Sequence, residues 1–306
     1  MVGVVILNWN ELGHTLRCLK SLRKTKRSEI RTHIIVIDNG STVDPREELR
    51  RDFPEVDYVR LETNIGFAAG CNLGAKRALH LGAEFVLFLN NDTIAESDFL
   101  GPMLESFSIR PDLGVVSPLI RRAERPQEIE FAGGFINYAL GRFKARRSPL
   151  PGEESLQVCD YASGCCMLVS RQALEQVGLF DENFFAYFED TDVSIRARDK
   201  GFTVVCRVDT SITHVGSATT RSGLMHGTTS PLKHYLMARN RILLIRKHSP
   251  MLARIFFLVI MQPLIVLYYI AGFIIRYRPK KALAFLSGIR DGLFFGALGP
   301  EIDKWR

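Results

Sequence analysis

The feature that most constrains the fold of this chain is a repeated alternation of short apolar runs with segments of helical spacing. Residues 2–7 form an apolar run rich in valine, as expected of a strand buried on both faces, and residues 12–22 then place leucine at helical intervals. The alternation continues through strand-like runs at 33–37, 56–61, 85–89, 113–117, 165–169 and 203–208, and through helix-like segments at 45–51, 68–81, 97–109 and 171–177. It predicts an α/β fold in which a mostly parallel, Rossmann-like sheet is flanked by helices.

Polar residues follow three of the predicted strands at the point where each strand ends. They read Asn-Trp-Asn at 8–10, Asp-Asn-Gly at 38–40 and Asn-Asn-Asp at 90–92. A turn or a helix cap explains each triplet alone. Ligands of open α/β sheets, however, bind beyond the carboxyl ends of the strands, where these triplets would meet. The coincidence predicts a binding site at that edge of the sheet.

Three carboxylates lie within four residues, at Glu189, Asp190 and Asp192, after the aromatic run 184–188 and before a helical segment at 193–200. One interpretation is an acidic helix start, because carboxylates cap free N–H groups and suit the helix dipole. The other is a catalytic site, because neighbouring aromatic side chains exclude water and raise a carboxyl pKa, as a general base requires. The pattern alone leaves both open.

Asp92 is the best metal candidate in the sequence. Mg²⁺ and Mn²⁺ prefer oxygen ligands, and they often use one or two protein carboxylates together with substrate phosphates. His214 could add an imidazole ligand, although a single histidine at a strand end is more often structural.

Asp38 and Trp9 are candidates for binding a nucleotide base. Asp38 could accept a hydrogen bond from a pyrimidine N–H, and Trp9 could stack on the base or pack as an ordinary aromatic residue. The sequence contains no phosphate-binding glycine motif of the Walker or GxGxxG type, so phosphate charge must be met by a metal and by basic side chains. Arg221, within the Ser/Thr/Gly-rich segment 217–230, is one such side chain.

Charge and apolar character are concentrated in the last quarter of the chain. Residues 231–306 hold 13 Lys/Arg and 3 Asp/Glu, a formal charge of +10, and because the whole chain is +7 the preceding residues carry −3. A segment that is both basic and apolar points to anionic lipid rather than to nucleic acid.

Residues 255–275 form an uncharged run of 21 residues, long enough to span a bilayer. Lys and Arg flank it on both sides, so charge gives no clear orientation. We expect attachment at the cytoplasmic face of a membrane, either by helices lying in the interface or by a hairpin kinked at Pro263, slightly ahead of a single span. A buried core helix or a dimer interface is the alternative.

The remaining features fit a protein of a reducing compartment. The six cysteines show neither a CxxC pair nor metal-ligand spacing. Residues 1–7 lack a basic segment and are too short for a signal peptide, so we interpret them as the first strand.

Six segments together resemble glycosyltransferase family 2, in its rhamnosyltransferase-like branch, and the resemblance covers nearly the whole chain. They are VVILNWN at 4–10, IVIDNGS at 35–41, NIGFAAGCN at 64–72, LNND at 89–92, SGCCM at 163–167 and FEDTD at 188–192. The resemblance implies the GT-A fold, with a catalytic domain at 1–230 and a helical membrane-attachment region at 231–306. Within the catalytic domain it implies a nucleotide-sugar half at about 1–120 and an acceptor half at about 121–230.

The resemblance also implies roles for single residues. Asp190 would be the general base that deprotonates an acceptor hydroxyl, and Asp92, with His214 as a second ligand, would bind Mg²⁺ or Mn²⁺ at the donor diphosphate. The implied donor-binding residues are Asn8, Trp9, Asn10, Asp38, Asn64, Gly66, Asn91 and Arg221, and the implied acceptor-side residues are Gly164, Glu189 and Asp192. One departure from the family is Asn90, which replaces the first Asp of its Asp-X-Asp metal motif and lowers the negative charge there.

The expected function is that of an inverting, metal-dependent glycosyltransferase. Its donor would be dTDP-rhamnose or a UDP-sugar, and its acceptor a lipid-linked glycan or polysaccharide. A processive polysaccharide synthase is an alternative, but such enzymes carry a Gln/Arg-x-x-Arg-Trp motif, and the only tryptophans here are Trp9 and Trp305. A nucleotide-sugar-binding module without catalysis is the other alternative, for which Asn90 is the only sign.

Overall fold

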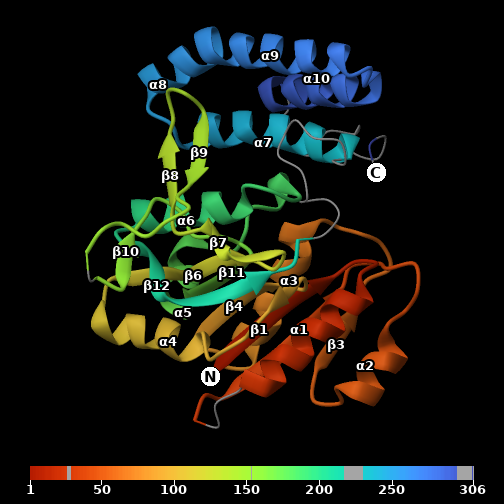
Figure 1. The fold of residues 1–306 in the computed structure, drawn as a ribbon, viewed down its shortest axis with the longest axis vertical. Coiled ribbons are helices and arrows are strands. Elements are labelled where there is room, and N and C mark those ends of the chain that lie inside the picture. Colours follow the sequence, from red (N-terminus) through yellow and green to blue (C-terminus); the bar gives the residue numbers. More distant parts are fainter. Residues whose placement is uncertain (26–28, 153, 217–229, 295–304, 306) are drawn as a thin grey trace. The chain divides into compact units, whose positions relative to one another are not determined.

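The computed structural model describes residues 1–25, 29–152, 154–216, 230–294 and 305. The chain forms two compact units. The first comprises Met1–Phe135, Ala145–Asp181 and Glu189–Gly216, and the second comprises Ile136–Lys144, Glu182–Phe188 and Ser217–Arg306. Each unit is described separately, with its elements labelled as in Figure 1.

The first unit is built on one mixed sheet. Its parallel part has the order β4-β1-β2-β3, formed by Phe85–Asn90, Val2–Asn8, Thr32–Asp38 and Asp57–Arg60. Beyond β4, β11 (Cys166–Ser170) runs antiparallel to both β4 and β6 (Leu113–Arg122), and β12 (Thr203–His214) runs parallel to β6. The short strands β5 (Thr93–Ile94), β7 (Arg125–Phe131) and β10 (Leu156–Val158) pair antiparallel at the margins. The predicted α/β fold class, a sheet flanked by helices, is confirmed.

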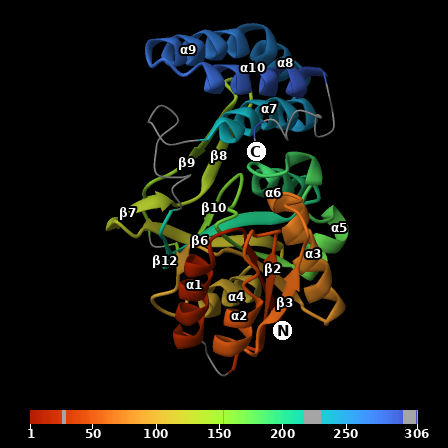
Figure 2. The same cartoon turned by 90° about the vertical axis from the view of Figure 1, so that its right-hand side faces the viewer.

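Helices cover both faces of this sheet (Figure 2). They are α1 (Leu12–Thr25), α2 (Arg46–Asp52), α3 (Phe67–His80), α4 (Leu100–Ile109), α5 (Arg171–Val177) and α6 (Glu189–Asp199). Alternate side chains of a strand point to opposite faces. On β1, Val4 lies beside Leu19 of α1, whereas Val5 faces α3, where a Cβ added at Gly74 would collide with it. The small residues of α3 therefore allow the helix to pack closely on the sheet.

Two elements differ from the sequence prediction in ways that bear on the site. Strand β12 continues past residue 208 to His214, because a bulge between Arg207 and Ser211 restores its pairing with β6 and its last two residues pair with β5. Helix α6 begins at Glu189 rather than at residue 193, so all three carboxylates lie in its first turn.

The second unit contains residues 136–144, which form most of the hairpin between β8 (Gly134–Asn137) and β9 (Arg142–Ala145), together with the short turn η1 (Glu182–Phe184) and a set of C-terminal helices. These helices are α7 (Pro231–His248), α8 (Met251–Phe256), α9 (Gln262–Ile275) and α10 (Pro279–Phe294). Helices α7 and α10 pack closely, because Gly288 and Gly292 of α10 let its backbone approach that of α7. Between the two helices, the Tyr235 hydroxyl donates a buried hydrogen bond of 2.7 Å to Asp291 Oδ2.

The aromatic run 184–188 has an unusual backbone. Phe185, Tyr187 and Phe188 all have positive φ, between 61° and 74°, a conformation that L-residues rarely adopt. Asn240 of α7 stabilises this run, because its side-chain amide donates to the carbonyls of Phe184, Ala186 and Tyr187 over 2.8–2.9 Å. Helix α6 follows directly in the chain.

Residues 251–275 form one continuous helix, the only one in the described part of the chain that is long and apolar enough to cross a membrane. Pro263 does not reverse the chain. It lacks an N–H and crowds the carbonyl four residues earlier, and a π-helical turn at Phe257–Met261 (η2) accommodates it. The chain reverses at residues 276–278 instead, so the predicted kink of a hairpin at Pro263 is wrong in position.

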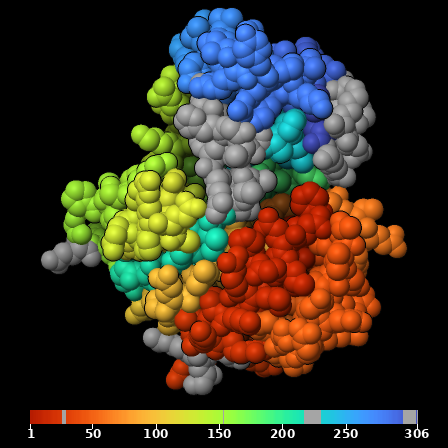
Figure 3. Space-filling view, turned by 45° about the vertical axis from the view of Figure 1, so that its right-hand side comes forward, coloured from red at the N-terminus to blue at the C-terminus, as the bar shows by residue number. Residues whose placement is uncertain are grey.

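One side of this long helix is exposed, and its residues are coloured blue in the space-filling view of Figure 3. The exposed side carries large apolar side chains at helical spacing: Leu252, Ile255, Phe256, Val259, Ile260, Leu264, Leu267, Tyr268, Ile274 and Ile275. We call this set the apolar stripe. The opposite side packs within the unit through Phe257, Tyr269 and Phe273.

Candidate functional site

The carboxyl ends of β1, β2 and β4 bring the predicted polar triplets together. Asn8 pairs directly with Asp38, and Leu7 pairs with Asn90, so the three strands end at the same level. Asn8 and Asp38 are both buried, which is unusual for polar residues unless protein groups satisfy them. The edge of the sheet is therefore a structured polar site.

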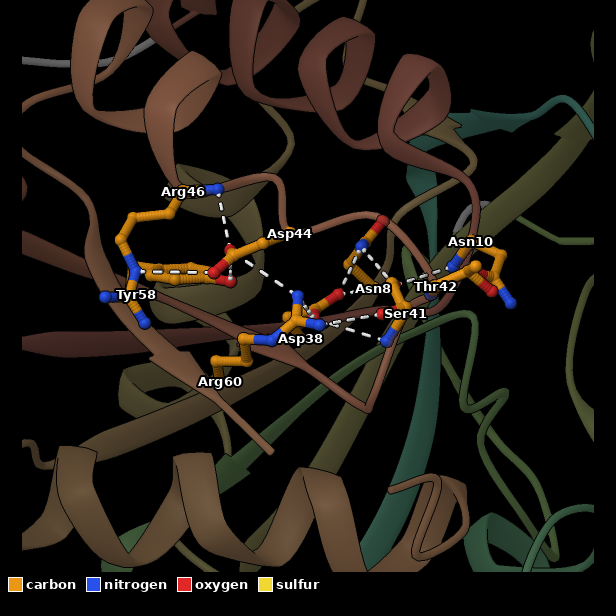
Figure 4. Close-up of polar contacts among 9 residues, drawn as sticks. All are labelled: Asn8, Asn10, Asp38, Ser41, Thr42, Asp44, Arg46, Tyr58 and Arg60. Atoms are coloured by element: carbon orange, nitrogen blue, oxygen red, sulfur yellow. Dashed lines mark hydrogen bonds and ion pairs between the residues drawn. The ribbon is translucent and has the colours of Figure 1, made fainter. Parts of the chain in front are cut away.

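Asp38 lies at the centre of a hydrogen-bond network (Figure 4). Its Oδ1 accepts from the Asn8 amide over 2.7 Å and from the Ser41 hydroxyl. Its Oδ2 accepts from Arg60 Nη1 over 3.0 Å and from the Ser41 backbone N–H over 3.3 Å. A carboxylate offers about four acceptor positions. All of them are used here, so a base N–H could bind Asp38 only by exchange with one of these donors.

Two further branches bring in other predicted donor-binding residues. Thr15 links the strand ends, since its hydroxyl donates to Asn8 over 2.8 Å and accepts from the Asn91 amide over 3.0 Å. The Asn39 amide donates to Asn64 Oδ1 over 3.0 Å and to the Gly66 carbonyl over 3.1 Å.

Trp9 and Asn10 lie on the loop after β1. The Asn10 backbone N–H donates to the Ser41 hydroxyl over 2.8 Å, and its side chain accepts from Thr42 over 2.8 Å. Trp9 is 50% exposed, so its ring is accessible for stacking. Arg221 lies outside the described residues, and its role at phosphate stays a prediction.

Asp92, His214 and Glu130 form a second cluster. His214 Nε2 lies 3.2 Å from Asp92 Oδ2, and its Nδ1 lies 3.1 Å from Glu130 Oε2. Burial alone would lower the pKa of His214, but the two carboxylates raise it to about 10. The same contact holds the pKa of Asp92 below its usual range despite burial.

The Asp92–His214 pair fits a divalent cation as two ligands. Adjacent ligands around Mg²⁺ or Mn²⁺ lie roughly 3 Å apart, because each is about 2.1 Å from the ion. The observed oxygen–nitrogen separation of 3.2 Å matches that spacing. Nearby, the side-chain oxygen of Asn90 is buried without a hydrogen-bond partner among the described residues. No group of three His, Cys, Asp or Glu side chains in those residues is arranged to hold one ion, so further ligands would come from substrate and water.

The three acids at the start of α6 have different environments. Asp190 Oδ2 accepts from the Gly164 backbone N–H over 2.8 Å, and its Oδ1 accepts from that of Thr191 over 2.6 Å. Burial raises the pKa of Asp190, and these hydrogen bonds oppose the rise. The geometry brings Gly164 and Asp190 together, as expected if both serve one site.

Glu189 and Asp192 differ from Asp190. Glu189 is buried, and its Oε2 has no hydrogen-bond partner among the described residues. Burial and the neighbouring Asp190 raise the pKa of Glu189 well above its usual value. Asp192 accepts from Arg196 Nε over 2.8 Å, and the same guanidinium binds the carbonyl of Leu179 in the loop after α5 over 2.7 Å. Asp192 therefore anchors α6.

Sequence reasoning missed Thr15, Ser41, Arg60 and Glu130. Ser41 stood in the motif at 35–41 and could have been read from it. Arg60 ends a strand that carried no polar triplet, and Glu130 lies on β7, which was not predicted. The partners of Arg60 and Glu130, which are Asp38 and His214, lie 22 and 84 positions away in the sequence, so only the sheet pairing reveals these two contacts.

Comparisons with known proteins identify the family to which the sequence is similar. Residues 3–178 match the family model described as Glycosyl transferase family 2. Over 272 residues the chain is 26% identical to the dTDP-rhamnosyl transferase RfbF of Shigella flexneri, covering 87% of this chain and 89% of that protein. It is also 26% identical to the N-acetylglucosaminyl-diphospho-decaprenol L-rhamnosyltransferase of Mycobacterium tuberculosis, covering 70% and 76%.

Among solved structures, the chain is similar to GalNAc-T7 with UDP, GalNAc and Mn²⁺. The TM-score is 0.67 at 16% sequence identity, and the match covers 84% of this chain. The match spans about half of that structure, 49%. At this identity the likeness concerns the fold.

Proposed function

This chain belongs to glycosyl transferase family 2 and is a glycosyltransferase; we propose that it transfers a sugar from a nucleotide-diphosphate donor to a hydroxyl of a lipid-linked or polysaccharide acceptor, with inversion and with a divalent metal. Two relatives bear rhamnosyltransferase names, which favours dTDP-rhamnose as donor over a UDP-sugar. The acceptor proposal has the same support, since one of those names specifies a diphospho-decaprenol.

The donor would bind at the carboxyl edge of β1, β2 and β4. Trp9 has an exposed ring for the base, and the network of Asn8, Asp38 and Ser41 fixes the loops around it. Asn64, Gly66 and Asn91 belong to the same hydrogen-bonded edge. Arg221 is retained as a proposed phosphate contact.

Asp92 and His214 would hold Mg²⁺ or Mn²⁺ at the donor diphosphate. When bound, the ion supplies positive charge that stabilises the departing diphosphate. His214 must give up its Nε2 proton to become a ligand, since a protonated imidazole has no lone pair to offer. The structure of GalNAc-T7 contains Mn²⁺ and UDP, which supports the choice of metal for this fold.

Asp190 would act as the general base. One of its oxygens takes the proton of the acceptor hydroxyl as that oxygen attacks the anomeric carbon from the face opposite the diphosphate. The bond from carbon to the diphosphate oxygen breaks, and its electron pair leaves with the nucleotide diphosphate. A single displacement of this kind inverts the anomeric centre. The raised pKa of Asp190 brings the carboxylate closer to the value that suits a base.

Attachment to the cytoplasmic face of a membrane would involve residues 231–306. The apolar stripe occupies one side of the helix 251–275, while its other side packs within the unit. A helix that is already covered on one side fits the interface plane better than an isolated span. Arg276, Arg278 and Lys280 at its end would contact anionic headgroups. The division into a catalytic region at 1–230 and an attachment region at 231–306 is part of this proposal.

The observation that carries the proposal is the Asp92–His214 pair at 3.2 Å at the edge of a family 2 sheet. The test is a panel of dTDP- and UDP-sugars in which release of the nucleotide diphosphate is measured with Mn²⁺, with Mg²⁺ and with EDTA. We expect release from dTDP-rhamnose that EDTA removes and added metal restores. Turnover that is unaffected by EDTA would contradict the metal assignment, and no release from any nucleotide sugar would contradict the donor class.

A further inference from the structure

We propose that Glu130 is a positioning residue that orients His214 as a metal ligand. The inference rests on the proposed metal site at Asp92 and His214. Glu130 belongs to none of the motifs by which the family was recognised, and the contact it makes is visible only in the folded chain. Its effect on the reaction would pass through His214 rather than through substrate.

The first observation is the way the two carboxylates bracket one imidazole ring. Asp92 Oδ2 lies 3.2 Å from Nε2, and Glu130 Oε2 lies 3.1 Å from Nδ1. The two ring nitrogens face opposite directions. Asp92 and His214 Nε2 would hold an ion together, whereas Glu130, at Nδ1, would not serve as a third ligand.

The second observation is a β-bulge that places Glu130. On β6, the consecutive residues Ile120 and Arg121 pair with Phe131 and Ile129 of β7, which leaves Glu130 between them as the extra residue. Bulges of this kind redirect a side chain, and they are frequent next to active sites. The next residue of β6, Arg122, pairs with His214 on the other side. The bulge thus brings Glu130 to the histidine at the end of β12.

The chemistry follows from the hydrogen bond at Nδ1. A carboxylate that accepts from Nδ1–H keeps the proton on that nitrogen and leaves the lone pair on Nε2, where a metal can take it. It also fixes the ring orientation and makes the imidazole a stronger donor to the metal. The His214 side chain is 9% exposed and the Glu130 side chain 35%. The hydrogen bond between them is therefore shielded from solvent mainly on the imidazole side.

The matched control is Glu128, two residues earlier on the same strand. Its carboxylate pairs with Arg125 over 2.8 Å, and its side chain is more exposed than that of Glu130. Glu128→Ala therefore removes one negative charge from β7 without touching His214. Any effect of net charge alone on cation binding would appear equally in both variants.

The experiment measures Mn²⁺ binding to the full chain in the presence of dTDP, by the electron paramagnetic resonance signal of free Mn²⁺. Affinity for dTDP without metal is measured in parallel by calorimetry. We expect Glu130→Ala to weaken Mn²⁺ binding by about 10–100-fold, the usual cost of losing such a partner. Glu130→Gln, whose amide oxygen can still accept from Nδ1–H, should recover most of the loss. Glu128→Ala should bind Mn²⁺ as the wild type does, and metal-free dTDP affinity should be the same in all variants.

Asp92→Ala separates failure of this inference from failure of the proposed site. Loss of Mn²⁺ binding in Asp92→Ala with wild-type binding in Glu130→Ala would overturn the positioning role and leave the site standing. Wild-type binding in Asp92→Ala would overturn the metal site itself and the inference with it. Should Glu130→Ala fail to fold, Glu130→Met, which keeps side-chain length without an acceptor, takes its place with the same expected loss.

Discussion

Oδ2 of Asp190 accepts a hydrogen bond from the backbone N–H of Gly164 over 2.8 Å. The two residues are 26 positions apart, and the bond fixes one oxygen of the proposed base against the segment that precedes β11. There is little room for a side chain at residue 164, because a Cβ added to Gly164 would lie 3.1 Å from Asp190 Cβ and 3.2 Å from Asp190 Oδ2. The absence of a side chain at residue 164 therefore allows the base to adopt its position.

Gly164→Ala should displace the Asp190 carboxylate by a few tenths of an ångström or more. We expect turnover to fall about ten- to a hundred-fold, since small misplacements of a reacting group have large effects on rate. Donor affinity should change little, because the donor contacts lie at other strand ends. Steady-state kinetics with a separate donor-binding titration checks this, and equal turnover in variant and wild type would remove Gly164 from the site.

Glu189 makes a prediction about stability and pH. Its folded-state pKa is raised, so the folded protein binds a proton more tightly than the unfolded chain does. The free energy of unfolding should therefore fall as pH rises above the ordinary glutamate value and level off above the raised pKa. Glu189→Gln removes this component, and its stability relative to wild type should increase from pH 5 to pH 9. Urea unfolding across that range is the measurement, and a constant difference would show that Glu189 ionises normally.

Asn240→Ala tests the support of the strained aromatic run. The variant leaves the carbonyls of Phe184, Ala186 and Tyr187 without their shared donor, next to three residues of positive φ. We expect a loss of about 1–3 kcal/mol in the free energy of unfolding. Chemical denaturation measures this, and Gln127→Ala, at an exposed position of β7, serves as a control. Equal stability in both variants would show that the run does not depend on Asn240.

The apolar stripe makes a prediction about membranes. Leu252, Val259 and Leu267 are 82%, 63% and 68% exposed, so replacing all three by Glu should leave the fold intact. Each large apolar side chain buried in lipid contributes about 1.5–3 kcal/mol, so vesicle binding should weaken at least about tenfold. Sedimentation with anionic vesicles is the assay, and Val43→Glu, 73% exposed in the other unit, is the control. Unchanged sedimentation of the triple variant would place the attachment elsewhere.

The fold and part of the site could be predicted from the sequence for a physical reason. The buried strands are recognisable in the sequence as runs of apolar, β-branched residues. The polar residues at their ends can be identified for each strand separately. His214 was identified as a candidate ligand, but its nearness to Asp92 depends on the extension of β12 and its pairing with β5. Glu130 and Arg60 act through partners on other strands, and local patterns contain no information about which strands pair.

The acids of α6 show the same limit. Three carboxylates in one first turn fit both an acidic helix start and a catalytic site, and composition could not separate them. The structure distinguishes their surroundings. Asp192 is bound to Arg196, Asp190 accepts from Gly164, and the buried Oε2 of Glu189 has no hydrogen-bond partner among the described residues. These are tertiary contacts. The sequence could therefore indicate that residues 189–192 belong to a site, but it could not assign a separate role to each acid from local pattern alone.

The assignment of Asp190 as the general base is tested most directly by measuring the turnover and the donor dissociation constant of Asp190→Asn. The variants Glu189→Gln and Asp192→Asn are measured alongside it. The amide is nearly isosteric with the carboxylate and can still accept from Gly164, but it cannot take a proton at neutral pH. We expect Asp190→Asn to lose about a hundred- to ten-thousand-fold in turnover with unchanged donor affinity, and the other two variants to retain more activity. Near wild-type turnover in Asp190→Asn would contradict the account, and it would identify Glu189 as the base if Glu189→Gln were inactive.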